Sequence, residues 1–318
     1  MTDVVWLCIL GFLLSGWFVL DGANLGLGMA LRHVGRSGPE RRLILTGLGP
    51  FLLGGEVWLV AAAGLLLGVF PALEKDLLYA YYPVIVAFVT AWLVRDMGVW
   101  FRSRRSSAVW QRGWERSIGA ASGVFAFAWG MLLGNVVHGV PDEGMPGVGT
   151  LFGPYSLLWG VTVVAALLMH GAVFTALRMP RARRARAVRT ARRAGGAVLA
   201  LFGLISLTTV AFGIDLAQRA PVLIVQAMAI IAAIGAERLL TAGRLGWSYA
   251  CTALVAVAPV LMAGIASAPR LLEGIADDST LDVLAGIVVP ALPVLIAVQA
   301  WMWHTFREPV TSRSATFF

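Results

Sequence analysis

The sequence predicts an all-α membrane protein with nine transmembrane helices. Apolar residues make up 59% of the 318 residues and charged residues only 13%, whereas soluble domains carry roughly 25% charge. A chain of this size with so few charges could not cover a globular surface in water. Nine mostly apolar runs reach the length of about 20 residues that a helix needs to cross a bilayer core. These runs do not show the alternating pattern of a membrane β-barrel.

The nine predicted spans follow one another along the chain. Pro221 lies at the start of the seventh span, where its missing N–H costs no helical hydrogen bond. The spans are Val4–Leu31, Leu43–Phe70, Leu77–Phe101, Ile118–Val140, Tyr155–Leu177, Ala194–Ile214, Pro221–Leu240, Trp247–Ile265 and Val283–Phe306.

The basic residues indicate how the spans are oriented. Of the 25 basic residues, 22 fall in the loops after spans one, three, five and seven, at the end of span three (Arg95), or in the C-terminal tail. The positive-inside rule therefore places the N-terminus outside and the C-terminus in the cytoplasm. The net charge of +8 is an orientation signal and does not indicate nucleic-acid binding, because the basic residues lie between apolar runs. The arginine-rich run 178–193 is predicted to be a cytoplasmic loop near anionic headgroups.

Two acids, Asp21 and Glu56, lie inside the first two spans. Each costs about 2.5–3.5 kcal/mol at a helix centre, so each is a candidate functional residue. Both fall near mid-depth and are expected to share one polar cluster, with Asn24 on the same helix face as Asp21. Two interpretations remain open, a protonated packing pair and a proton- or quinone-linked site. Nearby small residues allow close helix approach, and on the first span these are Gly22, Gly26 and Gly28.

Histidine placement bears on haem binding. Of the four histidines, only His170 lies clearly inside a span, so no two-histidine axial pair is expected at matching depth. We expect His170 to hydrogen-bond another helix, and we expect no haem or other metal to be ligated by this chain.

The motifs of this chain, in their order, resemble those of subunit II of the cytochrome bd quinol oxidase family. The matches keep the family's spacing over nearly the whole chain, and they include Trp58, Arg95, Arg102, Asn135 and His170. They are LDGANLGLGMALR (20–32), ERR (40–42), GPFLLGGEVWL (49–59), VRDMGVWFRSR (94–104), GNVVHGVP (134–141), FGPYSLLWGV (152–161), HGAVFTALR (170–178), APVLMAGIASAP (258–269) and AWMWHTFRE (300–308).

The resemblance implies two four-helix bundles, within residues 1–140 and 141–265, and a peripheral ninth helix with a short tail, residues 266–318. It implies a heterodimer with a subunit I that carries two b-type haems and one d-type haem. The complex would oxidise quinol and reduce O2 to water in the respiratory chain of a bacterial cell membrane. Subunit II would have no catalytic centre of its own, would support and shield subunit I, and could hold a structural quinone.

Three positions depart from the family pattern. Asn24, Leu53 and Trp100 stand where the family usually has acids. The acid replaced by Leu53 is the one associated with a proton channel through subunit II, and leucine cannot relay a proton or order a water chain. We therefore expect a reduced proton path, or a paralogue that no longer conducts protons. The alternative from another class is a proton-coupled secondary transporter using Asp21 and Glu56, although the chain shows no convincing inverted repeat.

Overall fold

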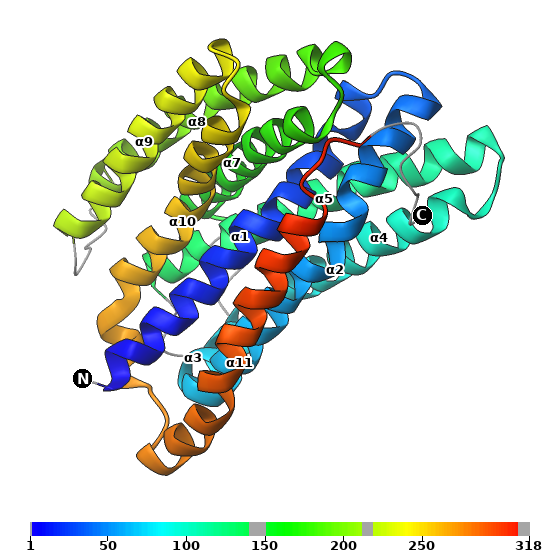
Figure 1. Ribbon diagram of the computed structural model, residues 1–318. Coiled ribbons are helices and arrows are strands. Elements are labelled where there is room, and N and C mark those ends of the chain that lie inside the picture. The colour runs from blue at the N-terminus through cyan, green and yellow to red at the C-terminus, as the bar shows by residue number, and fades with distance from the viewer. Residues whose placement is uncertain (1, 140–150, 212–218, 311–318) are drawn as a thin grey trace.

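The computed structural model describes residues 2–139, 151–211 and 219–310, and within these ranges it contains helices and no strand. Nine of the described helices, all except α3, are long and apolar enough to cross a membrane, which confirms the predicted fold class. The helices of Figure 1 are α1 (Thr2–Val34), α2 (Gly38–Val69), α3 (Pro71–Ala80), α4 (Tyr82–Phe101), α5 (Ala108–His138), α7 (Pro154–Arg178), α8 (Ala185–Ala211), α9 (Arg219–Thr241), α10 (Leu245–Glu273) and α11 (Asp278–Thr305).

Several helix ends follow from local sequence. Ser37 accepts a hydrogen bond from the Glu40 amide (3.3 Å), while the Glu40 carboxylate accepts one from the Arg36 amide (2.8 Å), so both side chains cap the start of α2. Asp277 caps α11 by accepting from the Thr280 amide (3.0 Å). The Ser279 hydroxyl, together with this bond and the Thr280 hydroxyl, donates to the exposed Asp277 carboxyl and holds its pKa at about 2.

The third predicted span differs from the observed helix. Leu77 belongs to the short helix α3, and the membrane-spanning helix α4 begins only at Tyr82. Pro83 stands in the first turn of α4, where its missing N–H is tolerated, so a helix start at this point fits the sequence. The predicted ends of the fourth and sixth spans, Val140 and Ile214, lie outside the described residues.

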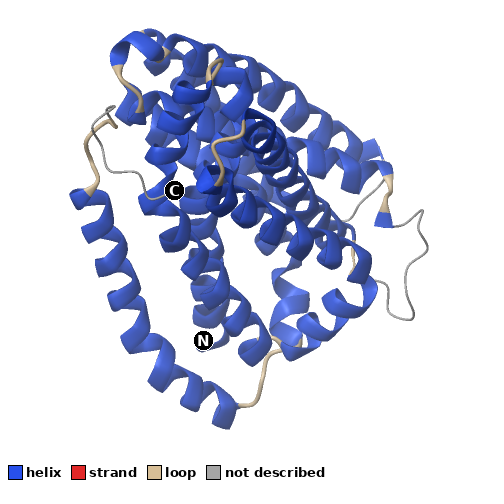
Figure 2. Cartoon of the chain, turned by 90° about the vertical axis from the view of Figure 1, so that its right-hand side faces the viewer, coloured by secondary structure: helices blue, strands red, loops and turns tan. Residues whose placement is uncertain are grey.

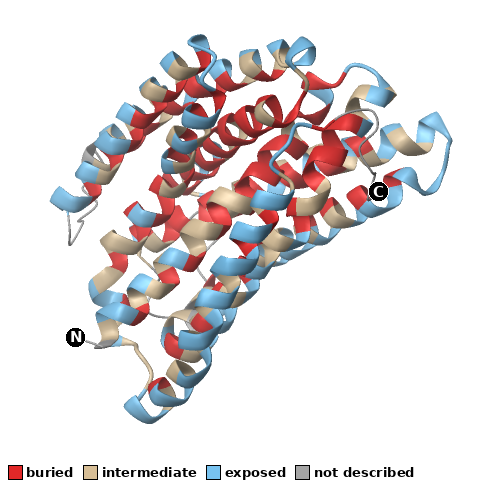
Figure 3. Cartoon of the chain, in the orientation of Figure 1, coloured by how far each residue is buried: buried red, intermediate tan, exposed pale blue. Residues whose placement is uncertain are grey.

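α7 lies at the centre of the bundle and α11 at its edge. α7 packs against α1, α5, α8 and α10, and it is the most deeply buried of the nine long helices. α11 is the least buried and runs along one side of the molecule, against α2 (Figures 1 and 2). Exposed residues cover most of its outer surface (Figure 3). An apolar helix with so little protein around it must face lipid or a partner chain.

The helices that precede residues 140–150 in the chain pack closely on the helices that follow them. α4 and α5 pair, α1 lies on α2 and α5, and α7 to α10 pack as consecutive neighbours, while α1 and α5 both contact α7. The division into two bundles therefore stays a prediction. Its boundary at residue 265 falls inside α10, which continues through Pro269 to Glu273.

Helices α1 and α7 approach each other closely in the core. A methyl group added to Gly26 would overlap the carbonyl oxygen of Leu167, and one added to Gly171 would overlap the backbone of Gly26. Small residues let two membrane helices approach until their backbones touch. At this crossing, the absence of a side chain at Gly26 lets the backbones of α1 and α7 approach each other.

Candidate functional site

The most unusual side-chain arrangement in the described residues is one buried arginine that contacts three acids. The Arg95 guanidinium binds both carboxylate oxygens of Asp21 through Nη1 and Nη2, each at 3.1 Å. Nη2 also donates to Glu56 Oε1 (2.9 Å), and Nε lies 2.7 Å from Asp96 Oδ1. Four carboxylate oxygens thus surround a group that stays charged at every physiological pH.

Three helices bring these residues together. Asp21 comes from α1, Glu56 from α2, and Arg95 with Asp96 from α4, so the guanidinium joins α4 to both neighbouring helices. Trp92, one turn before Asp96, donates its indole N–H to Glu56 Oε1 (3.2 Å). The arrangement is an ion-pair cluster that also aligns three membrane-spanning helices.

Asn24 extends the cluster toward α2. Its amide nitrogen donates to Asp21 Oδ1 (3.0 Å) and to the Phe51 carbonyl oxygen (3.1 Å). Phe51 lies four residues before Gly55, and a methyl group at Gly55 would crowd Asp21. Asp21, Asn24 and Glu56 thus lie in one polar cluster.

Exposure increases across the cluster from α1 outward. The side chains of Asp21 and Arg95 are 0% and 1% exposed, whereas those of Glu56 and Asp96 are 12% and 22% exposed. Asp21 is sealed inside the bundle, and Glu56 and Asp96 lie near the outer face of α2 and α4. Any exchange with the surroundings must therefore begin at Glu56 and Asp96.

The placement of Arg95 differs from the sequence interpretation. Its position at the end of an apolar run predicts a cytoplasmic flanking charge, but Arg95 is buried and faces Asp21 inside the bundle. The reason is geometric. The end of an apolar run gives only an approximate depth in the membrane, and α4 continues for six residues beyond Arg95, to Phe101. The sequence patterns that indicate Asp21 and Glu56 do not indicate Asp96. Its signal in the sequence is an acid next to an arginine inside an apolar run.

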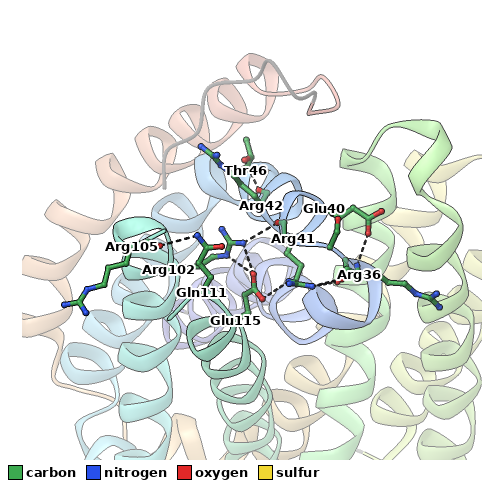
Figure 4. A network of polar contacts seen from close by, with 12 residues as sticks. Arg36, Glu40, Arg41, Arg42, Thr46, Arg102, Arg105, Gln111 and Glu115 are labelled. Atoms are coloured by element: carbon green, nitrogen blue, oxygen red, sulfur yellow. Dashed lines mark hydrogen bonds and ion pairs between the residues drawn. The ribbon is translucent and has the colours of Figure 1, made fainter. Parts of the chain in front are cut away.

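A second network lies at the end of the molecule where α2 and α5 begin (Figure 4). Glu115 of α5 is fully buried, and its Oε1 accepts from Arg102 Nη2 (2.7 Å) and Nε (3.0 Å). Its Oε2 lies 2.6 Å from Arg41 Nε of α2. Arg102, a predicted structural residue, thus holds the end of α4 to α5 and, through Glu115, to α2.

Glu115→Gln is expected to lower the stability of the protein by about 3–5 kcal/mol, because it leaves two arginines beside a neutral amide in a buried site. Thermal unfolding of the purified protein measures the effect. The matched control is Glu237→Gln, which breaks an exposed pair with Arg192 (3.2 Å) and should cost about 1 kcal/mol or less. Equal losses from the two substitutions would contradict a stabilising role for Glu115.

His170 forms a third polar site, at the centre of the bundle. Nδ1 lies 2.9 Å from Thr252 Oγ1 on α10, and Nε2 lies 2.9 Å from the Val19 carbonyl oxygen on α1. The ring stacks on Tyr249 with centroids 4.6 Å apart. The expected hydrogen bonds to other helices are therefore present, and they occupy both ring nitrogens. Within the described ranges no three His, Cys, Asp or Glu side chains gather in a way that could hold a metal ion.

Comparison with known proteins identifies the family of this chain. The model of the cytochrome bd terminal oxidase subunit II family matches residues 2–306. The chain belongs to this family. Cytochrome bd ubiquinol oxidase subunit 2 of Bacillus subtilis is 28% identical over 331 residues, covering 97% of each chain. The bd-I subunit 2 of Escherichia coli K12 is 26% identical over 355 residues, covering 95% of this chain and 93% of that one.

A solved structure shares the fold. A chain of the bd oxidase from Geobacillus thermodenitrificans superposes with a TM-score of 0.61 at 11% identity, covering 96% of this chain and 98% of that one. This likeness supports the nine-helix membrane architecture. The family membership makes the chain subunit II of a cytochrome bd oxidase, a membrane-bound oxidoreductase complex.

The remaining motif residues of this subunit II contribute to packing. Asn135 accepts from Ser156 Oγ (2.6 Å) and joins α5 to α7. Trp58 of α2 lies over Gly16 of α1, where a methyl group would overlap its ring. At two further glycines of α1 a methyl group would meet a side chain of another helix, Leu167 at Gly22 and Ser122 at Gly28.

Proposed function

We propose that this chain is the haem-free second subunit of a bd-type complex that oxidises quinol and reduces O2 to water in a bacterial cytoplasmic membrane. The observation that carries the proposal is the family match over residues 2–306. The names of the relatives from B. subtilis and E. coli, ubiquinol oxidase subunit 2, agree with it. In this proposal the two b-type haems and the d-type haem belong to subunit I, and quinol and O2 react there. A structural quinone in this chain stays a prediction.

The geometry of His170 supports a haem-free role. Both of its ring nitrogens already contact oxygen atoms of α1 and α10, whereas an axial ligand must offer one nitrogen to iron. Converting His170 to a ligand would break the bond to Val19 or to Thr252 in the core. The described polar sites therefore suit a scaffold better than a redox centre.

The outer face of α2 and α4 supports a partner at that position. Exposed apolar residues surround the two half-buried acids on this face, including Leu53 and Val60 on α2 and Leu93 on α4. A carboxyl group facing lipid at this depth is costly, so a protein surface should cover Glu56 and Asp96. We infer that subunit I packs here, and that this chain shields it from lipid.

The orientation and the proton route belong to the same proposal. The arginines of Figure 4 and of the run 178–193 would lie on the cytoplasmic side, with the N-terminus outside. Leu53 interrupts the family's acidic route, and Arg95 seals Asp21 from the outer face. A reduced proton path through this subunit follows. Asp21→Leu, which removes the main partner of Arg95, should impair assembly or turnover.

Co-purification tests the proposal. An affinity tag on this chain should recover a second subunit in equal amount, together with the absorbance of b and d haems, and both should be lost when subunit I is deleted. Recovery of a stable single chain without haem from cells that express both subunits would overturn the proposal. Proton-coupled uptake by vesicles that contain this chain alone would favour the transporter alternative.

A further inference from the structure

Glu56 and Asp96 lie side by side on one edge of the Arg95 guanidinium. Glu56 Oε1 contacts Nη2 (2.9 Å) and Asp96 Oδ1 contacts Nε (2.7 Å), while Asp21 takes the other edge through Nη1 and Nη2. Nε and Nη2 belong to one planar group, so the two oxygens that contact them lie on the same edge of the guanidinium.

The charges of this cluster do not balance. Asp21 binds Arg95 in a two-point pair that neutralises the guanidinium. Ionised Glu56 and Asp96 would then add two negative charges on one edge of the guanidinium within the apolar span, where neighbouring like charges are strongly disfavoured. A proton on one of the two carboxyl groups removes one of these charges, and the protonated group can donate it to the other.

Within the described part of the chain, the groups that face the pair from neighbouring helices do not supply another cation. α1 contributes Asp21, and α5 contributes the Phe125 ring, with Arg95 Cζ 5.8 Å from its centroid. α4 itself contributes Trp92, whose N–H donates to Glu56. α11 packs against α2 through the neutral Gln299 near Gly54. Arg95 is the cation that the pair contacts, and Asp21 already neutralises it.

We propose that Glu56 and Asp96 share one proton and form a proton-binding site on the face of α2 and α4 that subunit I covers. The site rests on the proposed function, since it needs a partner over this face. The proton lies between a Glu56 or Asp96 carboxylic acid and the carboxylate of the other, and its release leaves both groups ionised against Arg95. Uptake reverses this step without any change in covalent bonds between heavy atoms.

Asp96 gives this site a carboxyl that the α2 motif alone does not supply. Leu53 stands one turn before Glu56 on the exposed face of α2 and cannot bind a proton. Asp96 reaches the same edge of Arg95 from α4. The pair is also the most exposed part of the cluster, so it accepts or releases protons toward the interface while Asp21 stays paired inside.

Infrared difference spectroscopy of the whole oxidase complex tests the site. The wild-type complex near neutral pH should show the C=O stretching band of a protonated carboxyl group, and its contribution should disappear in both Glu56→Gln and Asp96→Asn. Either substitution leaves Arg95 with Asp21 and only one further carboxylate, which no longer has a like charge beside it on that edge and stays ionised. The matched control is Asp282→Asn on the exposed surface of α11, which should leave the band unchanged.

Haem absorbance measured on the same samples separates this inference from the proposed function. Complexes with normal haem content that lose the band in both variants support the shared proton. Normal haem content with an unchanged band in either variant overturns it while leaving the subunit II assignment intact. Because both substitutions keep side-chain size and hydrogen-bonding capacity, a purely structural role would not remove the band.

Discussion

Arg95→Met is expected to prevent this chain from assembling into a haem-containing complex. The substitution removes the one side chain, among the residues that the structure describes, that contacts Asp21 of α1, Glu56 of α2 and Asp96 of α4 together. Removing one partner from a buried ion pair costs about 3–5 kcal/mol, because the other charge is left uncompensated. A typical protein has a total stability of about 5–15 kcal/mol, so this loss is large. The measurement is the haem absorbance that co-purifies with a tagged chain.

A combined variant distinguishes charge from packing as the cause. Arg95→Met together with Asp21→Asn, Glu56→Gln and Asp96→Asn removes all four charges, and we expect it to recover a substantial part of the assembly. Replacing a whole buried ion cluster by neutral groups is far less costly than breaking it. Arg116→Met, on the exposed surface of α5, should assemble normally. If the combined variant assembles no better than Arg95→Met, the uncompensated charges are not the cause of the defect.

The membrane fold could be predicted from the sequence because apolar length and loop charge report directly on the bilayer. All nine predicted spans correspond to observed helices in the same order. The errors lie at the ends, as at Leu77, which the apolar run joins to the third span although the helix is interrupted at Tyr81. Hydropathy detects which residues tolerate lipid, but helix ends depend on prolines, caps and contacts beyond the apolar run.

The candidate site could be predicted only in part. Depth along α1 and α2 brought Asp21, Glu56 and Asn24 to one level, because both helices cross the same bilayer. Depth does not say which way a side chain turns, and Arg95 looked like a flanking charge since it lies near the end of its span. The same limit hid Asp96 and the burial of Glu115, whose partners come from helices far apart in the sequence.

Gly26→Ala is expected to destabilise the crossing of α1 and α7, which lies at the centre of the bundle. The added methyl group would overlap the Leu167 carbonyl oxygen and approach the backbone of Gly171 within 2.8 Å, so the helices must separate. Forcing extra volume into a packed core costs about 1–3 kcal/mol. Thermal unfolding of the complex should therefore occur at a lower temperature than in the wild type. Gly11→Ala on the same helix, where a methyl group meets no atom within 4 Å, should not lower it.

The double variant Gly26→Ala with Gly171→Ala tests the mechanism of that loss. The two glycines face each other, and a methyl group at Gly171 would overlap the backbone of Gly26. Once α1 and α7 have moved apart to admit one methyl group, the second meets less resistance. The stability loss of the double variant should therefore be smaller than the sum of the losses of the two single variants. Fully additive losses would mean that each substitution acts on its own helix, and the close approach of α1 and α7 would not be the source of the instability.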